Sequence, residues 1–213
     1  MIINKANTLI ERDVLVESVH YYMTLPKKTD IVIDEDTTVI VEQDGVIKGS
    51  WRFPAHGGGR NSLKRIAPTL KGSFLFGKMK NVTLHFLNNS EFEVSKQVQA
   101  KSATGIPCTF SGKLYFSVDK IDIRKLQKWI RDNNFKTNGS ILLTVSQIRN
   151  VVSNLLFERG FEYVVGKTRV NTTSPTFTMT KANSASTFVE IADYIQSNCD
   201  RFGFESLCLV EPV

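Results

Sequence analysis

Hydrophobic and polar residues alternate with a period of two along much of the first half of the chain. Within residues 37–43, Val39 and Val41 fall on one face, with the residues between them on the other. Such alternation is typical of a half-buried strand. The dipeptide Asp44–Gly45 then separates this run from a second one, and Asp-Gly between two strands is typical of a tight hairpin. Residues 37–53 are therefore expected to form two antiparallel strands.

The same period returns in three later runs, which are predicted to be further strands: residues 80–89, 90–100 and 105–118. An irregularity is expected at Gly112, because glycine inside a strand is typical of a bulge or a close backbone approach. Consecutive strands with short turns favour an antiparallel sheet. Residues 54–72 are rich in Gly, Pro and basic side chains without a sustained period, so they are expected to form a loop.

After Val118 the apolar residues recur at spacings of three and four, as in amphipathic helices. Three helices are expected, at residues 119–134, 140–159 and 184–201. Gly160 and Gly203 are expected to end the second and the third, because glycine commonly follows the last helical residue.

The start of the third helix is open to several readings. Thr187 and Glu190 fit a capping box, and either Asn183 or Ser184 could cap the helix equally well. Residues 163–184 are rich in Thr and Ser, and they form either a flexible linker or an extra hairpin.

After Gly203 the alternation resumes from Phe204 to Val210. A chain end is ordered when it is tied into a sheet, so this run is expected to be a buried strand that completes a sheet formed far upstream. The predicted fold class is α+β, with an antiparallel, sheet-rich N-terminal half, amphipathic helices and a closing C-terminal strand. The expected divisions are an N-terminal extension or extra strands, a strand-rich subdomain and a helical subdomain: residues 1–34, 35–118 and 119–213.

Composition indicates an ordered globular protein, since 41% of the 213 residues are hydrophobic and 23% are charged. No apolar run reaches the roughly 18 residues of a membrane-spanning helix. Charged side chains interrupt any signal-peptide core within residues 1–16. We therefore expect a cytoplasmic protein with no transmembrane segment.

The three cysteines, Cys108, Cys199 and Cys208, form no CxxC pair, and their odd number argues against a closed set of disulfides. They are expected to be small buried side chains in a reducing compartment.

No group of residues in the sequence matches a known catalytic pattern. His20, His56 and His85 are scattered and lack the spacing of a helical metal pair. His85 alternates within a predicted strand and is expected to be a structural or surface residue. There is no GxSxG elbow. No catalytic residue, metal ligand or cofactor is therefore expected, and the chain is not expected to be an enzyme.

The chain has a formal net charge of +6, and its basic residues are concentrated in two places. The loop from His56 to Lys71 holds the first group: Arg60, Lys64 and Arg65. One face of the first predicted helix holds the second: Lys120, Arg124, Lys128 and Arg131. These side chains either bind phosphates or form a solvated surface. Trp129 beside the second group either stacks on a base, lies at a membrane interface or packs inward.

Three stretches resemble the SPFH or Band 7 family of stomatins, prohibitins and flotillins, in its soluble, virion-core-like branch. TTVIVEQDGVIKG is similar to the opening strand and hairpin of that family. GIPCTFSGKLYFSVDKIDIRKL is similar to its long strand, which runs into an Asp-containing helix start. VEIADYIQSNCDRFGFESLCLVEPV is similar to the segment in which a helix ends in Gly and a strand returns. The likeness covers about residues 35–213. These 213 residues contain neither the hydrophobic anchor nor the long coiled coil of the family, so membrane anchoring and assembly into a large ring are not expected.

The resemblance implies that the terminal strand rejoins the N-terminal sheet and that the protein is a non-catalytic scaffold. Such a module self-associates as a homo-oligomer or binds another protein. Helical spacing offers a possible assembly seam: Val145, Ile148, Val152, Leu155, Phe188 and Ile195. The same spacing also suits packing within one chain. The alternative function is a small basic protein, of phage origin, that binds nucleic acid; an anionic membrane surface is a further possible partner.

Overall fold

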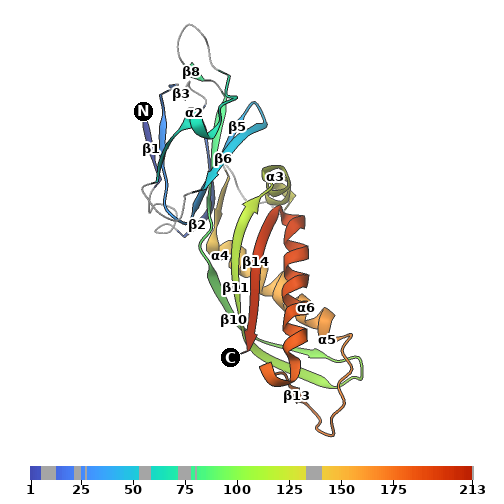
Figure 1. Cartoon of the computed structure of the whole chain (residues 1–213). Coiled ribbons are helices and arrows are strands. Elements are labelled where there is room, and N and C mark those ends of the chain that lie inside the picture. The colour runs from blue at the N-terminus through green and yellow to red at the C-terminus, as the bar shows by residue number, and fades with distance from the viewer. Residues whose placement is uncertain are drawn as a thin grey trace. The chain divides into compact units, whose positions relative to one another are not determined.

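The computed structural model describes residues 1–5, 13–21, 25–26, 28–52, 59–71, 78–79, 81–132 and 141–212. The fold is α+β, which confirms the predicted class. Contacts divide the chain into two compact units, each built from two segments (Figure 1). Unit 1 comprises residues 1–90 and 134–145, and unit 2 comprises residues 91–133 and 146–213. The boundary expected between residues 118 and 119 falls inside a strand instead.

The larger sheet of unit 1 has the strand order β12-β2-β9-β5-β6, and every neighbouring pair is antiparallel. Its strands are β2 (Val14–Tyr21), β5 (Thr37–Gln43), β6 (Val46–Arg52), β9 (Val82–Asn88) and β12 (Leu142–Thr144). The predicted hairpin is confirmed as β5 and β6. Its turn residues, Asp44 and Gly45, have φ angles of 51° and 76°, as a tight two-residue hairpin turn requires.

Shorter strands complete unit 1. β1 (Ile2–Asn4) runs parallel to β4 (Asp30–Val32), which pairs antiparallel with β7 (Arg60–Ser62). β3 (Leu25–Pro26) pairs with β8 (Lys78–Met79).

The prediction of a loop at residues 54–72 is wrong in part, because this segment contains β7 and the short helix α2 (Leu63–Ile66). Ser62 starts this helix, since its Oγ accepts a hydrogen bond from the Arg65 N–H at 3.3 Å.

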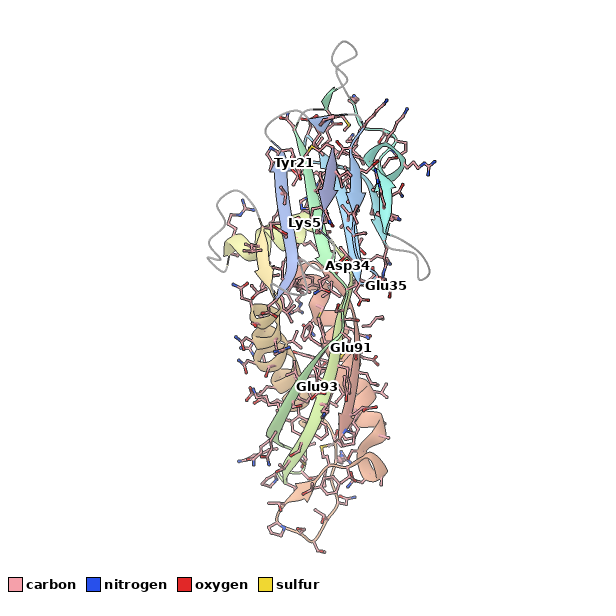
Figure 2. All side chains as sticks on the ribbon, turned by 90° about the vertical axis from the view of Figure 1, so that its left-hand side faces the viewer. Lys5, Tyr21, Asp34, Glu35, Glu91 and Glu93 are labelled. Carbon is pink, nitrogen blue, oxygen red and sulfur yellow. The ribbon has the colours of Figure 1, made fainter. Side chains whose placement is uncertain are left out.

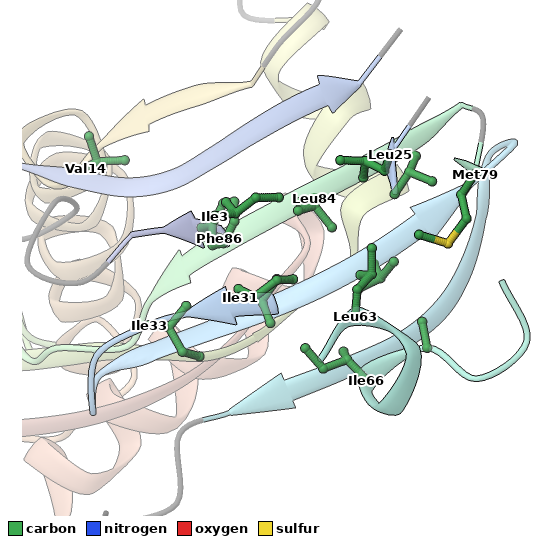
Figure 3. Packing of buried hydrophobic residues seen from close by; sticks show 14 residues of the cluster. Ile3, Val14, Leu25, Ile31, Ile33, Leu63, Ile66, Met79, Leu84 and Phe86 are labelled. Atoms are coloured by element: carbon green, nitrogen blue, oxygen red, sulfur yellow. The ribbon is translucent and has the colours of Figure 1, made fainter. Parts of the chain in front are cut away.

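The core of unit 1 lies on one face of the larger sheet (Figure 3). Alternate residues of β5 and β9, namely Val39, Val41, Leu84 and Phe86, are fully buried there. Residues of the shorter elements, such as Ile31 and Leu63, pack against them. Because side chains alternate across a strand, the residues between these face the opposite side of the sheet.

The sheet of unit 2 is built on β11 (Pro107–Ile121), which pairs antiparallel with β10 (Phe92–Lys101) on one side. On its other side it pairs antiparallel with β14 (Phe204–Pro212) and, near its start, parallel with β13 (Phe177–Thr178). The closing strand therefore completes a sheet formed far upstream, as predicted. That sheet is the one of unit 2, however, and not the N-terminal sheet of unit 1.

The helices of unit 2 cover the inner face of this sheet, where the aromatic rings of Phe110, Phe157, Phe161 and Phe188 meet with centroids 4.7 to 6.1 Å apart. The helical elements are α3 (Ile123–Asp132), α4 (Val145–Val151), the π-helix η1 (Val152–Glu158), α5 (Arg159–Val165), α6 (Lys181–Cys199) and the 3-10 turn η2 (Asp200–Phe202).

Several predicted helix boundaries are wrong, for identifiable reasons. α3 begins after Asp122 and not at Asp119, because the Asp122 carboxylate accepts the N–H groups of Arg124 and Lys125 at 3.0 and 3.1 Å. Gly160 does not end a helix. A Cβ atom at that position would lie 2.9 Å from the Tyr194 ring, so this glycine allows α5 and α6 to approach each other closely.

The third helix begins at Lys181, before the predicted start at residue 184, but its backbone leaves helical geometry at Ser184, with φ of −147° and ψ of 24°. A kink therefore falls at the predicted start. The Thr180 N–H donates to Asn183 Oδ1 at 2.7 Å, whereas Thr187 and Glu190 lie inside α6. α6 ends at Cys199, and η2 continues the helical segment to Phe202. Gly203 follows the last helical residue with φ of 83°, a conformation that favours glycine.

One further expectation is wrong. Gly112 causes no irregularity, because the register with β10 is continuous through it; the Phe110 ring fills the space that a Cβ would need. Residues 163–184 form no hairpin of their own, since β13 pairs with β11, and residues 166–176 contain no helix or strand.

Candidate functional site

The candidate site is the edge of the unit 2 sheet formed by β14. Among the described strands, only β11 pairs with β14, so one side of this nine-residue strand is an open edge. α6 lies along β14 on the inner side (Figure 1). An open edge presents unpaired N–H and C=O groups to any chain that can lie beside it.

Side chains of β14 alternate between the two faces of the sheet. Phe204 and Val210 point inward and are buried, whereas Leu207 and Leu209 point outward and are 62% and 54% exposed. On α6, next to the same edge, Val189 is 61% exposed. Covering such a half-exposed side chain contributes about 1 kcal/mol. The edge is therefore flanked by apolar surface on both faces.

A groove runs between α6 and the second half of β14, with a volume of about 340 Å³. Its helical wall carries Ala185, Val189 and Ala192, and its strand wall is the stretch from residue 208 to 212. The charged residues that line it, Asp193 and Glu211, are both acidic. The groove can therefore hold an apolar side chain beside a positive charge.

Charged residues stand at both ends of the exposed leucines. Glu205 pairs with Lys120 at 2.9 Å. Glu211 lies opposite Lys113 in the register, and Lys113 is already paired at 3.1 Å with Glu93, which lies on β10 and is labelled in Figure 2. The hydrogen bond to Glu93 is the main cause that raises the pKa of Lys113, and Glu211 adds to it. Charged residues therefore lie at both ends of the β14 edge, and apolar residues lie at its centre.

Most side chains of the expected assembly seam are buried within the chain itself. Four of them are at most 5% exposed: Ile148, Val152, Phe188 and Ile195. Val145 is partly exposed, and the side chain of Leu155 lies outside the described residues. The burial of these four side chains favours packing within one chain over pairing with a second chain.

The two expected basic groups are exposed but partly neutralised. Arg60, on β7, pairs with Asp30 through Nε at 3.1 Å. Lys64 and Arg65 are exposed on α2. His56 and its neighbouring glycines at positions 57 and 58 lie outside the described residues.

In the second group, Lys120 belongs to β11 and not to a helix, and Arg124, Lys128 and Arg131 are exposed on α3. Trp129 packs within unit 2, with its ring 5.3 Å from that of Phe202. Of the three alternatives for Trp129, inward packing therefore fits better than stacking on a base or lying at a membrane interface.

A buried polar network crosses the outer face of the unit 1 sheet. The carboxylate of Glu42 accepts a hydrogen bond from His85 Nε2 at 3.0 Å, and His85 Nδ1 accepts one from Ser18 Oγ at 2.7 Å. Burial lowers the pKa of His85, against the opposing effect of Glu42. His20 makes a similar contact with Thr83 at 2.6 Å. His85 is thus structural, one of the two alternatives for it.

A hydroxyl, an imidazole and a carboxylate in this order also form nucleophilic triads. Here, however, Ser18 is only 4% exposed and projects from the middle of a sheet face, so a substrate carbonyl has no approach to its Oγ. The network supplies hydrogen-bond partners for buried polar groups, which would otherwise be costly to bury.

The cysteines are free, as expected; Cys108 and Cys199 are buried and Cys208 is partly exposed. Burial raises the pKa of the Cys199 thiol to about 11 and also raises that of Cys208. Neither thiol is therefore activated as a nucleophile at neutral pH.

Across the described ranges, no cluster of three or more His, Cys, Asp or Glu side chains is placed to hold a metal ion. Within the same part of the chain, no helix is both long and apolar enough to cross a membrane.

Sequence reasoning missed that the leucines of β14 are exposed. The signal was present, because β14 carries apolar residues at both odd and even positions, and such a strand needs cover on both faces. Comparison with known proteins finds no match to a protein-family model or to a characterised protein sequence.

Proposed function

We propose that this chain is a non-catalytic scaffold module that binds protein partners. The observation that carries the proposal is the apolar surface at the open edge of β14, formed by Val189, Leu207 and Leu209. Proteins usually protect an open strand edge with charges, proline or a bulge. Exposed apolar surface next to unpaired backbone groups is typical of a site that another polypeptide covers.

The resemblance of the sequence to SPFH proteins favours the same function, because members of that family are oligomerising scaffolds. The spacing of the seam residues adds little to this argument, since Ile148, Val152, Phe188 and Ile195 are buried. The sheet edge of unit 2 is therefore the better candidate for contact with a partner.

The charges support a protein partner over nucleic acid. Three exposed cations each lie next to a carboxylate: Arg60 beside Asp30, Lys120 beside Glu205 and Lys125 beside Asp200. Surface pairs of this kind contribute little to stability, but they reduce the local positive potential that binding to phosphates requires.

The mass of the purified protein in solution, measured by light scattering at about 100 and about 500 mM salt, tests the proposal, because exposed charge contacts are strongly screened across this range. We expect material without the ultraviolet absorbance of nucleic acid, and a mass that salt does not change. Nucleic acid that is bound at low salt, released at high salt and lost in the Lys128→Glu, Arg131→Glu double variant would contradict the proposal.

A further inference from the structure

The open edge of β14 has the geometry that accepts an added strand. β11 occupies one side of β14 throughout its length, from Phe204 to Pro212. Beside the other side lies the groove whose helical wall is α6. An extended segment laid along this edge would gain main-chain hydrogen bonds from β14, and every second side chain would enter the groove.

The surface around the edge indicates what kind of segment fits. Inward side chains of an added strand would contact Val189 and Ala192 on α6, and outward side chains would lie next to Leu207 and Leu209. Apolar residues are therefore favoured at the centre of the segment on both faces.

The charges of the groove indicate where basic residues are favoured in the added segment. The charged side chains lining the groove, Asp193 and Glu211, are negative, and both lie beside the second half of β14, which ends at Pro212. Glu211 directly precedes Pro212, whereas Asp193 is close enough to Cys208 to raise the pKa of that thiol. Lys113, opposite Glu211 in the register, is shared with Glu93. A strand that adds antiparallel to β14 starts at this end, so basic residues are favoured at its N-terminal end.

Glu205 and Glu211 disfavour the pairing with a second copy of this chain that would cover the exposed leucines. Antiparallel pairing of two β14 strands that brings Leu207 opposite Leu209 also brings Glu205 opposite Glu211. Like charges directly opposite each other destabilise a strand pair.

We propose that β14 binds an extended segment of another protein by strand addition, and that this segment is apolar at its centre and basic at its N-terminal end. The inference rests on the proposed function and names the class of partner.

A fluorescent synthetic peptide, Lys-Arg-Thr-Val-Val-Val-Thr, is a direct probe, with binding measured by anisotropy. One control peptide replaces the basic pair with Glu-Glu. A second control replaces the central valine with proline, which removes a main-chain N–H and cannot continue a ladder. The full chain is titrated with each peptide.

The test variant is Val189→Asp, which adds a negative charge to the apolar helical wall. Val189 is 61% exposed, so we expect the substitution to leave the core intact, and equal thermal midpoints of the variant and the parent protein would confirm this. The matched control is Ile47→Asp, at an exposed apolar residue of unit 1 that is 49% exposed. Hydrogen exchange of the β14 amides, with and without peptide, locates the contact.

We expect the basic peptide to bind, to slow amide exchange in β14, and to lose about tenfold or more in affinity in Val189→Asp, a typical cost at the centre of an interface. Ile47→Asp should bind normally, and both control peptides should bind weakly. Equal binding of the proline peptide, no effect of Val189→Asp, or no binding at all would overturn the inference.

The two proposals fail in different ways. A salt-resistant homo-oligomer that binds none of the peptides would overturn strand addition by a basic segment and leave the scaffold function standing. Nucleic acid bound at low salt would overturn the scaffold function itself.

Discussion

At the scale of single residues, His85 shows how the sheet of unit 1 accommodates polar side chains. Both ring nitrogens have a partner, Ser18 at 2.7 Å and Glu42 at 3.0 Å, so the neutral imidazole is fully satisfied. A second proton would place a buried charge on Nδ1 and remove the acceptor for the Ser18 hydroxyl. The lowered pKa of His85 has burial as its main cause.

This network predicts a stability that depends on pH. Because the folded-state pKa of His85 is lowered, the unfolded chain binds a proton first as pH falls below about 6.5. The free energy of unfolding should then decrease, by at most about 1.4 kcal/mol per pH unit, the limit for one proton. Stability should be fully present above the unfolded value and lost as pH falls toward the folded value.

Urea unfolding at pH values between about 7 and 5 measures this effect, with Trp51 as the reporter of unit 1 in a Trp129→Phe background. His85→Gln should flatten the pH dependence, although it lowers stability at pH 7 because the network loses a partner. Ile47→Ser, at an exposed position of the same unit, is the control and should retain the slope. An unchanged slope in His85→Gln would contradict the assignment.

At the scale of elements, Gly203 fixes the turn from η2 into β14. Its φ is 83°, and a Cβ atom there would lie 2.7 Å from the Leu126 backbone nitrogen and 2.8 Å from the Asp122 oxygen. The Asp122 N–H also donates to the Gly203 carbonyl at 2.8 Å. This glycine therefore joins the start of α3 to the start of β14.

We predict that Gly203→Ala lowers the free energy of unfolding of unit 2 by about 2 to 4 kcal/mol, the sum of left-handed strain and a backbone clash. Gly105→Ala is the matched control in the same unit. Its φ is 79° with nothing within 4 Å of the added Cβ, so only the strain of about 1 kcal/mol remains. Denaturant unfolding followed by Trp129 fluorescence in a Trp51→Phe background checks both values, and equal losses would contradict the crowding argument.

Local signals predicted some elements well. The hairpin of β5 and β6 follows from Asp44 and Gly45, because few dipeptides adopt two positive φ angles. The end of the helical segment formed by α6 and η2 follows from Gly203, because glycine adopts a positive φ without steric cost. Such a preference is local to the residue, so the sequence indicates it directly.

Other features depend on tertiary contacts and could not be predicted in this way. Gly160 is needed for its small size next to Tyr194, and sequence gives no means to separate that need from a helix stop. The π-helix η1 also shifts the phase of the apolar repeat, so that Phe157 is fully buried. The two-sided apolar pattern of β14 shows that both of its faces need cover, but which face the chain itself covers is a tertiary property, so the pattern alone does not reveal that Leu207 and Leu209 are exposed.

At the scale of the whole molecule, the chain consists of two units, and each has its own sheet and core. Unit 1 buries its polar network and its core, and α6 and β14 of unit 2 carry the exposed apolar edge. The net charge of +6 does not extend to this edge, because the charged residues lining its groove are Asp193 and Glu211. Overall charge and local charge thus have opposite signs, which favours a basic polypeptide as the partner.

The most direct test of the central claim, that a protein partner binds at the β14 edge, is site-specific photocrosslinking in the cells that make the protein. A benzoylphenylalanine residue replaces Leu207 in one variant and Ile47 in the control, two exposed apolar positions of 62% and 49% exposure. The account predicts protein adducts at position 207 in several-fold excess over position 47. Equal yields at the two positions, or adducts to nucleic acid alone, would contradict it.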